Sequence, residues 1–183
     1  ISISIFTLEI LIHPADYELN FNYFKFFILF LISIIMIPIQ SILEELIFRG
    51  YLMQGFTVFF KNRIMPLFAT SIIFGLLHIL NPEIQKIGYG LLIYYIGTGI
   101  FFGIVTLMDE GVELSSGFHA SNNLVASLLV TADWTAFETY SIFKFIGNPS
   151  FSKEVVLYVF IIYPLIIFFL SKKYKWASWK TKI

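Results

Sequence analysis

Two carboxylates and a guanidinium stand together in the stretch SILEELIFRG, residues 41–50, directly after a long apolar run. Charged side chains inside an apolar span cost about 2.5–3.5 kcal/mol each on insertion scales and indicate a functional site by default. Glu45 and Arg49 are four residues apart with the acid first, which favours an ion pair on one helix face. Glu44 is rotated by about 100° from Glu45, so we expect it to face elsewhere. Arg49 is expected to neutralise Glu45. Because a carboxylate in a medium of low dielectric is a candidate general base, Glu44 is the candidate for catalysis.

Two histidines follow in later apolar segments. Phe74 lies four residues before His78 and is expected to pack against its ring. His119 and Asn123 are four residues apart, so an imidazole and an amide donor share one helix face, and Asn122 is a weaker candidate for that face. We measure depth along each helix from the end that is expected on the cytoplasmic side, at 1.5 Å per residue. His78 then lies about 18 Å and His119 about 12 Å from that end. We therefore expect both to meet the glutamate in one cavity open to that side.

Each of these features also has a purely structural explanation. A Glu45–Arg49 pair can simply staple a helix, a single His inside a span packs helices about as often as it catalyses, and an Asn beside a His can hydrogen-bond two helices together. One Glu and two His on three separate segments at matched depth are harder to explain in this way. Their joint occurrence favours a functional site.

Two other kinds of chemistry remain open. Glu44, His78 and His119 form a legitimate zinc ligand set, a carboxylate with two imidazoles. However, the chain has no H-E-x-x-H helix, and only the paired Glu45 would then remain as a base. A transporter is the weakest alternative, because no pair of broken helices in corresponding halves is visible.

Composition indicates an integral membrane protein. Of 183 residues, 58% are hydrophobic, 19% are aromatic and only 13% are charged, far from the balance of a soluble domain. The net charge is zero and no basic, aromatic-interleaved patch appears outside the tail, which argues against a nucleic-acid partner. Cysteine is absent, which excludes disulfides, a thiol nucleophile and a cysteine metal site.

The hydropathy pattern predicts an all-α fold, a polytopic transmembrane helical bundle forming a single domain over residues 1–183. Pro38 is a predicted kink, and Asn81-Pro82 a predicted turn. The chain begins ISISIF without an initiator Met, and a fragment or processed form that lacks N-terminal helices is an interpretation that stays open. Apolar spans are expected over residues 21–40, 65–80, 89–108, 118–131 and 155–170.

Basic residues orient this bundle. The C-terminal tail is predicted to be cytoplasmic, because cytoplasmic segments are rich in Lys and Arg. Threading the spans backwards then places Lys61 and Arg63 on the same side, in agreement with that rule. The composition, rich in Ile, Phe, Lys and Asn, favours a bacterial plasma membrane. The basic residues of the tail are Lys172, Lys173, Lys175, Lys180 and Lys182.

The motifs EELIFR, FGLLH and HASNN, in this order on successive apolar segments, resemble those of the CPBP family of intramembrane proteases. This family, also called Abi, includes type II CAAX prenyl proteases and bacteriocin-processing enzymes. The resemblance covers residues 41–130. It implies a multi-pass membrane endopeptidase that uses neither a metal nor another cofactor.

The resemblance also implies roles for individual residues. Glu44 and His78 would activate a water molecule, and His119 with Asn123 would stabilise the oxyanion. The expected partners are the lipid bilayer and a peptide, lipid-anchored or membrane peptide substrate. A non-catalytic immunity or scaffold protein of the same family is the alternative. The residues expected to support the site are Glu45, Arg49 and Phe74.

Overall fold

The computed structural model describes the chain except residues 1, 137, 152, 178 and 180–183. Lys180 and Lys182 of the basic tail therefore lie outside the described residues. Contacts divide the chain into two compact units, each made of two segments. Unit 1 contains Ile1–Ile42 and Gly117–Pro149, and unit 2 contains Leu43–Ser116 and Ser150–Ile183. The single membrane-embedded domain expected over residues 1–183 stays a prediction.

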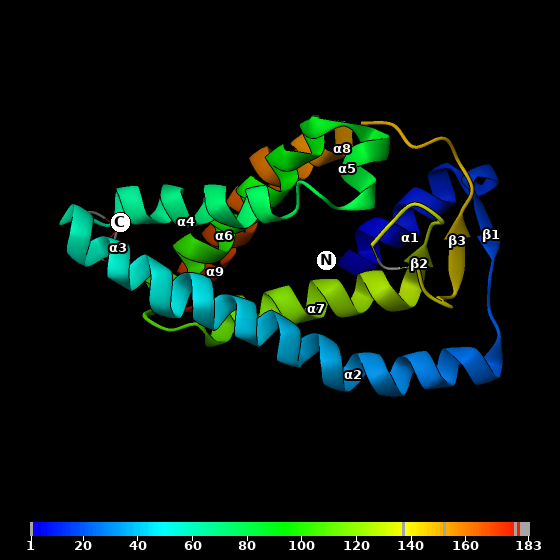
Figure 1. Cartoon of the computed structure of the whole chain (residues 1–183), viewed down its shortest axis with the longest axis horizontal. Coiled ribbons are helices and arrows are strands. Elements are labelled where there is room, and N and C mark those ends of the chain that lie inside the picture. The colour runs from blue at the N-terminus through cyan, green and yellow to red at the C-terminus, as the bar shows by residue number, and fades with distance from the viewer. Residues whose placement is uncertain (1, 137, 152, 178, 180–183) are drawn as a thin grey trace. The chain divides into compact units, whose positions relative to one another are not determined.

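Unit 1 combines long helices with a small three-stranded sheet, which Figure 1 shows beside α1. The strand order is β1-β3-β2, with β1 antiparallel and β2 parallel to β3. The rings of Tyr17 and Phe145, which face each other across β1 and β3, pack edge to face at 5.3 Å. The elements are α1 (Ser2–Ile12), a 3-10 turn (Pro14–Asp16), β1 (Tyr17–Leu19), most of α2 (Tyr23–Glu45), most of α7 (Glu113–Leu129), β2 (Val130–Thr131) and β3 (Phe143–Phe145).

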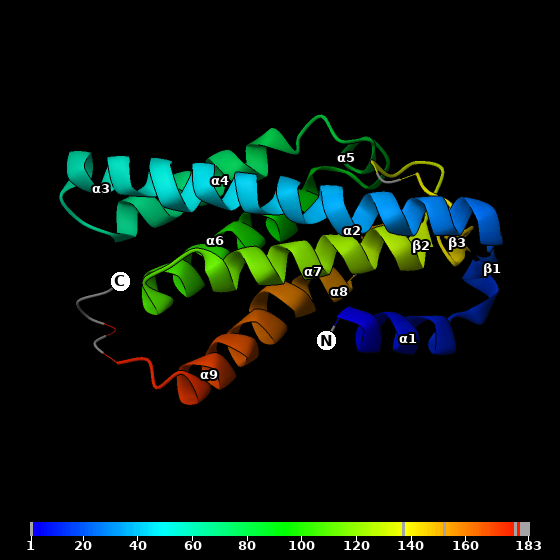
Figure 2. The ribbon, with the colours of Figure 1, turned by 90° about the horizontal axis from the view of Figure 1, so that it is seen from below.

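Unit 2 is helical. Its α3 and α4 form a hairpin that Figures 1 and 2 both show, and α4 packs along α6. The C-terminal helices pack against α6 as well. The elements are a π-helix (Leu46–Leu52), α3 (Met53–Phe60), α4 (Ile64–Leu77), α5 (Pro82–Ile87), a 3-10 turn (Tyr89–Leu91), α6 (Leu92–Asp109), α8 (Lys153–Leu157), a second π-helix (Tyr158–Ile162) and α9 (Tyr163–Lys173).

Individual Asn and Pro residues explain where some of the helices begin and end. The side chain of Asn22 accepts the N–H of Lys25 at 3.2 Å and so caps the start of α2. The predicted turn at Asn81-Pro82 is confirmed, because α4 ends just before it and Pro82 occupies the first turn of α5. Pro38 lies inside α2.

Three helical segments in the described part of the chain are long and apolar enough to cross a membrane, namely Tyr23–Phe60, Tyr89–Asp109 and Val155–Lys173, with α4 as a shorter apolar helix. The predicted spans over residues 21–40, 65–80, 89–108 and 155–170 thus correspond to apolar helices. The span predicted over residues 118–131 is only partly correct. A helix is present there, but it starts earlier, at Glu113, and its Ser, His and Asn residues make it less apolar.

Small residues allow α4 and α6 to approach closely. Ser71 and Gly75 are four apart on α4, and Gly99 and Gly103 are four apart on α6. A Cβ atom added to Gly99 would lie 2.9 Å from the Cα atom of Ser71, which real Cβ atoms essentially never do. Pairs of small residues at this spacing are typical of close helix packing in membranes. The packing fixes the backbone against which the buried charges of unit 2 lie.

Candidate active site

The first feature of the site is a buried ion pair in unit 2. Arg49 Nη1 lies 3.0 Å from Glu45 Oε1, and both side chains have no exposed surface. Arg49 Nη2 donates a hydrogen bond of 3.0 Å to the carbonyl oxygen of Gly99. The guanidinium carbon also lies 4.8 Å from the centre of the Phe74 ring and 5.6 Å from that of Phe102. The ion pair predicted from the four-residue spacing is confirmed, and it joins the π-helix region to α6.

Glu44 occupies a different environment from its neighbour. Its side chain is half-buried, whereas that of Glu45 is completely buried. The two residues end α2, and the π-helix that carries Arg49 begins directly after them. π-Helical segments within α-helices are frequent at functional sites. The separation of the two carboxylates agrees with their predicted helix faces, while the catalytic role of Glu44 stays a prediction.

His78 lies at the C-terminal cap of α4, and its orientation is fixed locally. Its Nδ1 atom is 2.8 Å from the carbonyl oxygen of Phe74. A carbonyl oxygen only accepts, so Nδ1 carries the proton and the lone pair of the neutral ring is on Nε2. The Phe74 ring also packs against the imidazole at 4.9 Å, which confirms the predicted contact. Nε2 is thus the His78 atom able to accept a proton.

Phe74 connects the ion pair to the histidine. The ring is 3% exposed, lies below the Arg49 guanidinium, contacts the edge of Phe48 at 5.3 Å and reaches His78. The structure therefore brings Glu45, Arg49, Phe74 and His78 into one contiguous cluster within unit 2.

Tyr95 and Glu83 also contact this cluster, although no pattern in the sequence predicts them. The Tyr95 ring stacks on the His78 imidazole with centroids 4.1 Å apart and an angle of 19° between the planes. Its hydroxyl donates a 2.8 Å hydrogen bond to Glu83 Oε1, which also receives a 3.4 Å contact from the side-chain amide of Asn81. Ten tyrosines are spread through this aromatic chain, so the sequence carries no signal that singles out Tyr95.

The remaining candidates lie on α7 in unit 1. His119 is buried, with 6% of its surface exposed, and Asn122 and Asn123 are half-buried. Within one continuous helix, His119 and Asn123 share a face as predicted. The predicted meeting of these residues with Glu44 and His78 in one cavity stays a prediction.

A pocket of about 690 Å³ in unit 2 reaches the ion pair. Arg49 is part of its wall, together with Gln54, Arg63 and Glu110, but neither Glu44 nor His78 lines it. In the described residues no group of three or more His, Asp or Glu side chains is placed to hold a metal ion.

Comparison with known proteins identifies the class. Residues 24–125 match the family described as Rce1-like, type II CAAX prenyl endopeptidase Rce1-like. The match covers more than half of the chain, and the chain belongs to this family of polytopic helical membrane proteases. The matched segment contains the EELIFR and FGLLH motifs and extends through His119 and Asn123 of the HASNN motif. The family expected from the three motifs is confirmed, and with it an all-α integral membrane protein.

A relative extends the similarity beyond the motifs. The chain is 32% identical over 181 residues to the Bacillus subtilis (strain 168) protein named "Uncharacterized protein YyaK". This alignment covers 94% of the present chain and 59% of the relative, so the chain spans about three fifths of the length of that protein. No solved structure matches the chain.

Proposed function

We propose that this chain is an intramembrane endopeptidase in which Glu44 activates the attacking water. The main observation in support of the proposal is that two adjacent carboxylates lie in different environments. Glu45 is completely buried in an ion pair with Arg49, whereas Glu44 is half-buried at the end of α2, two residues before the π-helix begins. Membership of a protease family supports peptide hydrolysis as the reaction.

In the proposed reaction, Glu44 accepts a proton from water while the water oxygen forms a bond to the carbonyl carbon of the scissile peptide. His78 assists through Nε2, because Nδ1 is already bound to the Phe74 carbonyl oxygen. The carbonyl π bond opens to give a tetrahedral oxyanion. Collapse of this intermediate breaks the C–N bond, and the proton held by Glu44 passes to the leaving amine. The products are a carboxylic acid and a free amine, so the step needs no oxidant, reductant or cofactor.

His119 and Asn123 are proposed as the donors that stabilise the oxyanion. The burial of His119 and the shared helix face support this role, because donors act most strongly where water is excluded. Glu45, Arg49 and Phe74 are proposed to support the site by fixing the backbone around Glu44 and the ring of His78.

The proposed substrate is a peptide or a membrane-associated protein segment, cleaved in a bacterial plasma membrane with the C-terminus of the enzyme in the cytoplasm. The exposed apolar surface of the spanning helices supports access from the bilayer. Maturation of a secreted peptide, including a bacteriocin, or immunity to one is the proposed biological setting.

The test compares cells that carry the full chain with cells that carry Glu44→Gln. Mass spectrometry of secreted and cell-surface peptides should reveal new termini that are present with the unaltered chain and absent with Glu44→Gln at equal membrane levels. Glu45→Gln is the matched control, one residue away. It breaks a buried pair, which typically costs about 3–5 kcal/mol, and should mainly lower the amount of folded protein. Equal loss of termini at equal folded yield for both variants would show that the assignment of the two carboxylates is wrong.

The same peptide termini distinguish the proposed function from the other candidate functions. A non-catalytic immunity or scaffold protein predicts identical peptide sets for the unaltered chain and Glu44→Gln. A zinc enzyme predicts that phenanthroline abolishes cleavage in purified, membrane-reconstituted protein and that added zinc restores it. The glutamate mechanism predicts that cleavage continues in the chelator.

A further inference from the structure

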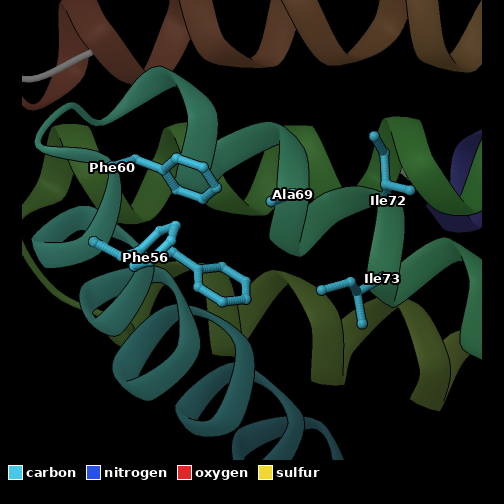
Figure 3. Close-up of a pocket in the computed structure, with 6 residues that line it drawn as sticks. Phe56, Phe60, Ala69, Ile72 and Ile73 are labelled. Carbon is cyan, nitrogen blue, oxygen red and sulfur yellow. The ribbon is translucent and has the colours of Figure 1, made fainter.

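A groove of about 460 Å³ lies between α3 and α4 in unit 2, and none of its lining residues is among those proposed for catalysis. Figure 3 shows Phe60 and Phe56 of α3 on one side and Ala69 with Ile73 of α4 on the other. In the wall, the ring of Phe60 packs edge to face with Phe59 at 5.0 Å and with Phe56 at 6.1 Å between ring centres. The lining consists only of apolar side chains, namely Phe56, Phe59, Phe60, Ala69, Ile72 and Ile73.

This groove opens toward the surroundings of the helices. Phe59 is 77% exposed, and Phe60 and Ile72 are about half as exposed. Phe59 and Phe60 end a segment that is apolar enough to cross a membrane, and α4 is apolar too. In a bilayer such a surface meets hydrocarbon, so the natural occupant of an apolar groove there is an acyl chain.

A cation stands at one end of the groove. Lys61 directly follows Phe60 in the turn between α3 and α4, and its side chain is exposed. The turn is ordered by Asn62, whose side chain accepts the N–H of Met65 at 2.8 Å and donates to the carbonyl oxygen of Phe60 at 3.0 Å. The positive end of the α4 dipole lies at the same turn. Positive charge is therefore held beside the mouth of the groove, as an anionic headgroup would require.

We propose that this groove and turn bind one anionic phospholipid of the cytoplasmic leaflet. The acyl chain occupies the groove, and the phosphate lies against Lys61. The basic turn is on the cytoplasmic side in the orientation predicted from the charges of the tail, where anionic lipids attract basic residues. This site does not depend on the proposed peptidase activity.

The test measures lipid binding to the purified full chain by native mass spectrometry, with dioleoyl phosphatidylglycerol and dioleoyl phosphatidylcholine as probes. Phosphatidylglycerol should bind at lower concentration than phosphatidylcholine. A basic residue near an anionic surface contributes about fivefold in affinity, converted from about 1 kcal/mol. Lys61→Gln should therefore weaken phosphatidylglycerol binding about fivefold and leave phosphatidylcholine binding unchanged.

The matched control is Lys172→Gln, which removes the same charge at the end of α9. It should leave both lipids unaffected. Ala69→Phe, which fills the groove, should weaken both lipids, with circular dichroism used to confirm the helical fold. Unchanged phosphatidylglycerol binding in a folded Lys61→Gln variant would overturn the proposal. An equal loss in the control variant would overturn it as well, because charge alone would then explain the binding.

Discussion

At the scale of single residues, the imidazole of His78 is held from two sides. Phe74 supplies a carbonyl acceptor and a tilted ring from the same helix, and Tyr95 supplies a stacked ring from α6. The hydroxyl of Tyr95 is itself anchored on Glu83. An imidazole gripped in this way keeps one tautomer and one direction, which is what a group that moves protons at a fixed point requires.

Removing the stacked ring tests this arrangement. An aromatic pair contributes about 0.5–1.5 kcal/mol beyond its area, so Tyr95→Leu should lower turnover by up to about tenfold. The substrate concentration needed should change little, because the substrate itself does not rely on this contact. Tyr95→Phe keeps the stack and loses only the bond to Glu83, so it should retain most of the activity. The measurement is cleavage of a peptide identified by its new terminus, and a greater loss in Tyr95→Phe than in Tyr95→Leu would show that stacking is not what matters.

The oxyanion role proposed for His119 and Asn123 on α7 gives a second residue-scale prediction. Removal of one preorganised donor typically costs about a hundred- to thousandfold in turnover, and Asn123→Ala should show this loss with little change in KM. Asn122→Ala is the neighbouring control and should do much less, because it lies three rather than four residues from His119. If Asn122→Ala were the damaging change, the motif would be displaced by one residue.

Among these residues, the contacts that the sequence predicts are those between residues close together in the chain. The Glu45–Arg49 pair and the Phe74–His78 contact each join residues four apart, so helical periodicity alone places them together. Tyr95 reaches His78 only because α4 packs along α6. Contacts of that kind leave no periodic trace in the sequence.

At the scale of helices, the close contact between α4 and α6 makes Gly99 sensitive to substitution. A Cβ atom there would meet the backbone of Ser71, and backbone cannot move as a side chain can. Overpacking typically costs about 1–3 kcal/mol. Gly99→Val should therefore lower the thermal unfolding midpoint of the purified protein and displace the carbonyl that binds Arg49. Gly55→Ala is the control, since nothing lies within 4 Å of its added Cβ.

The control Gly55→Ala lies on α3 and should be neutral or slightly stabilising, because glycine loses more backbone freedom on folding than alanine does. Equal midpoints for Gly99→Val and the unaltered chain would contradict the close packing of the two helices.

Helix positions were largely predictable because long apolar runs dominate them, whereas irregular elements were not. The π-helix over Leu46–Leu52 is one example, since nothing in LIFRGYL distinguishes it from an α-helix. The sheet of unit 1 is another. Its strands are two or three residues long and form only by pairing distant segments, so they show no alternation of their own.

At the scale of the whole molecule, orientation in the membrane governs both proposals, since it decides which leaflet meets the basic turn and which side a peptide enters from. The charge distribution predicts a cytoplasmic position for Lys61 and for the tail at Lys175, and the opposite side for Gln85 in the segment between α4 and α6. All three side chains are exposed.

The chain has no cysteine, so single cysteines can report this orientation without background. Lys61→Cys and Lys175→Cys should react with a membrane-impermeant maleimide only after the cells are opened, whereas Gln85→Cys should react in intact cells. The three substitutions lie in exposed segments and should leave the fold unchanged. Labelling of Lys61→Cys in intact cells would place the basic turn in the outer leaflet. The lipid proposal in its present form would then fail, while the glutamate mechanism could still hold.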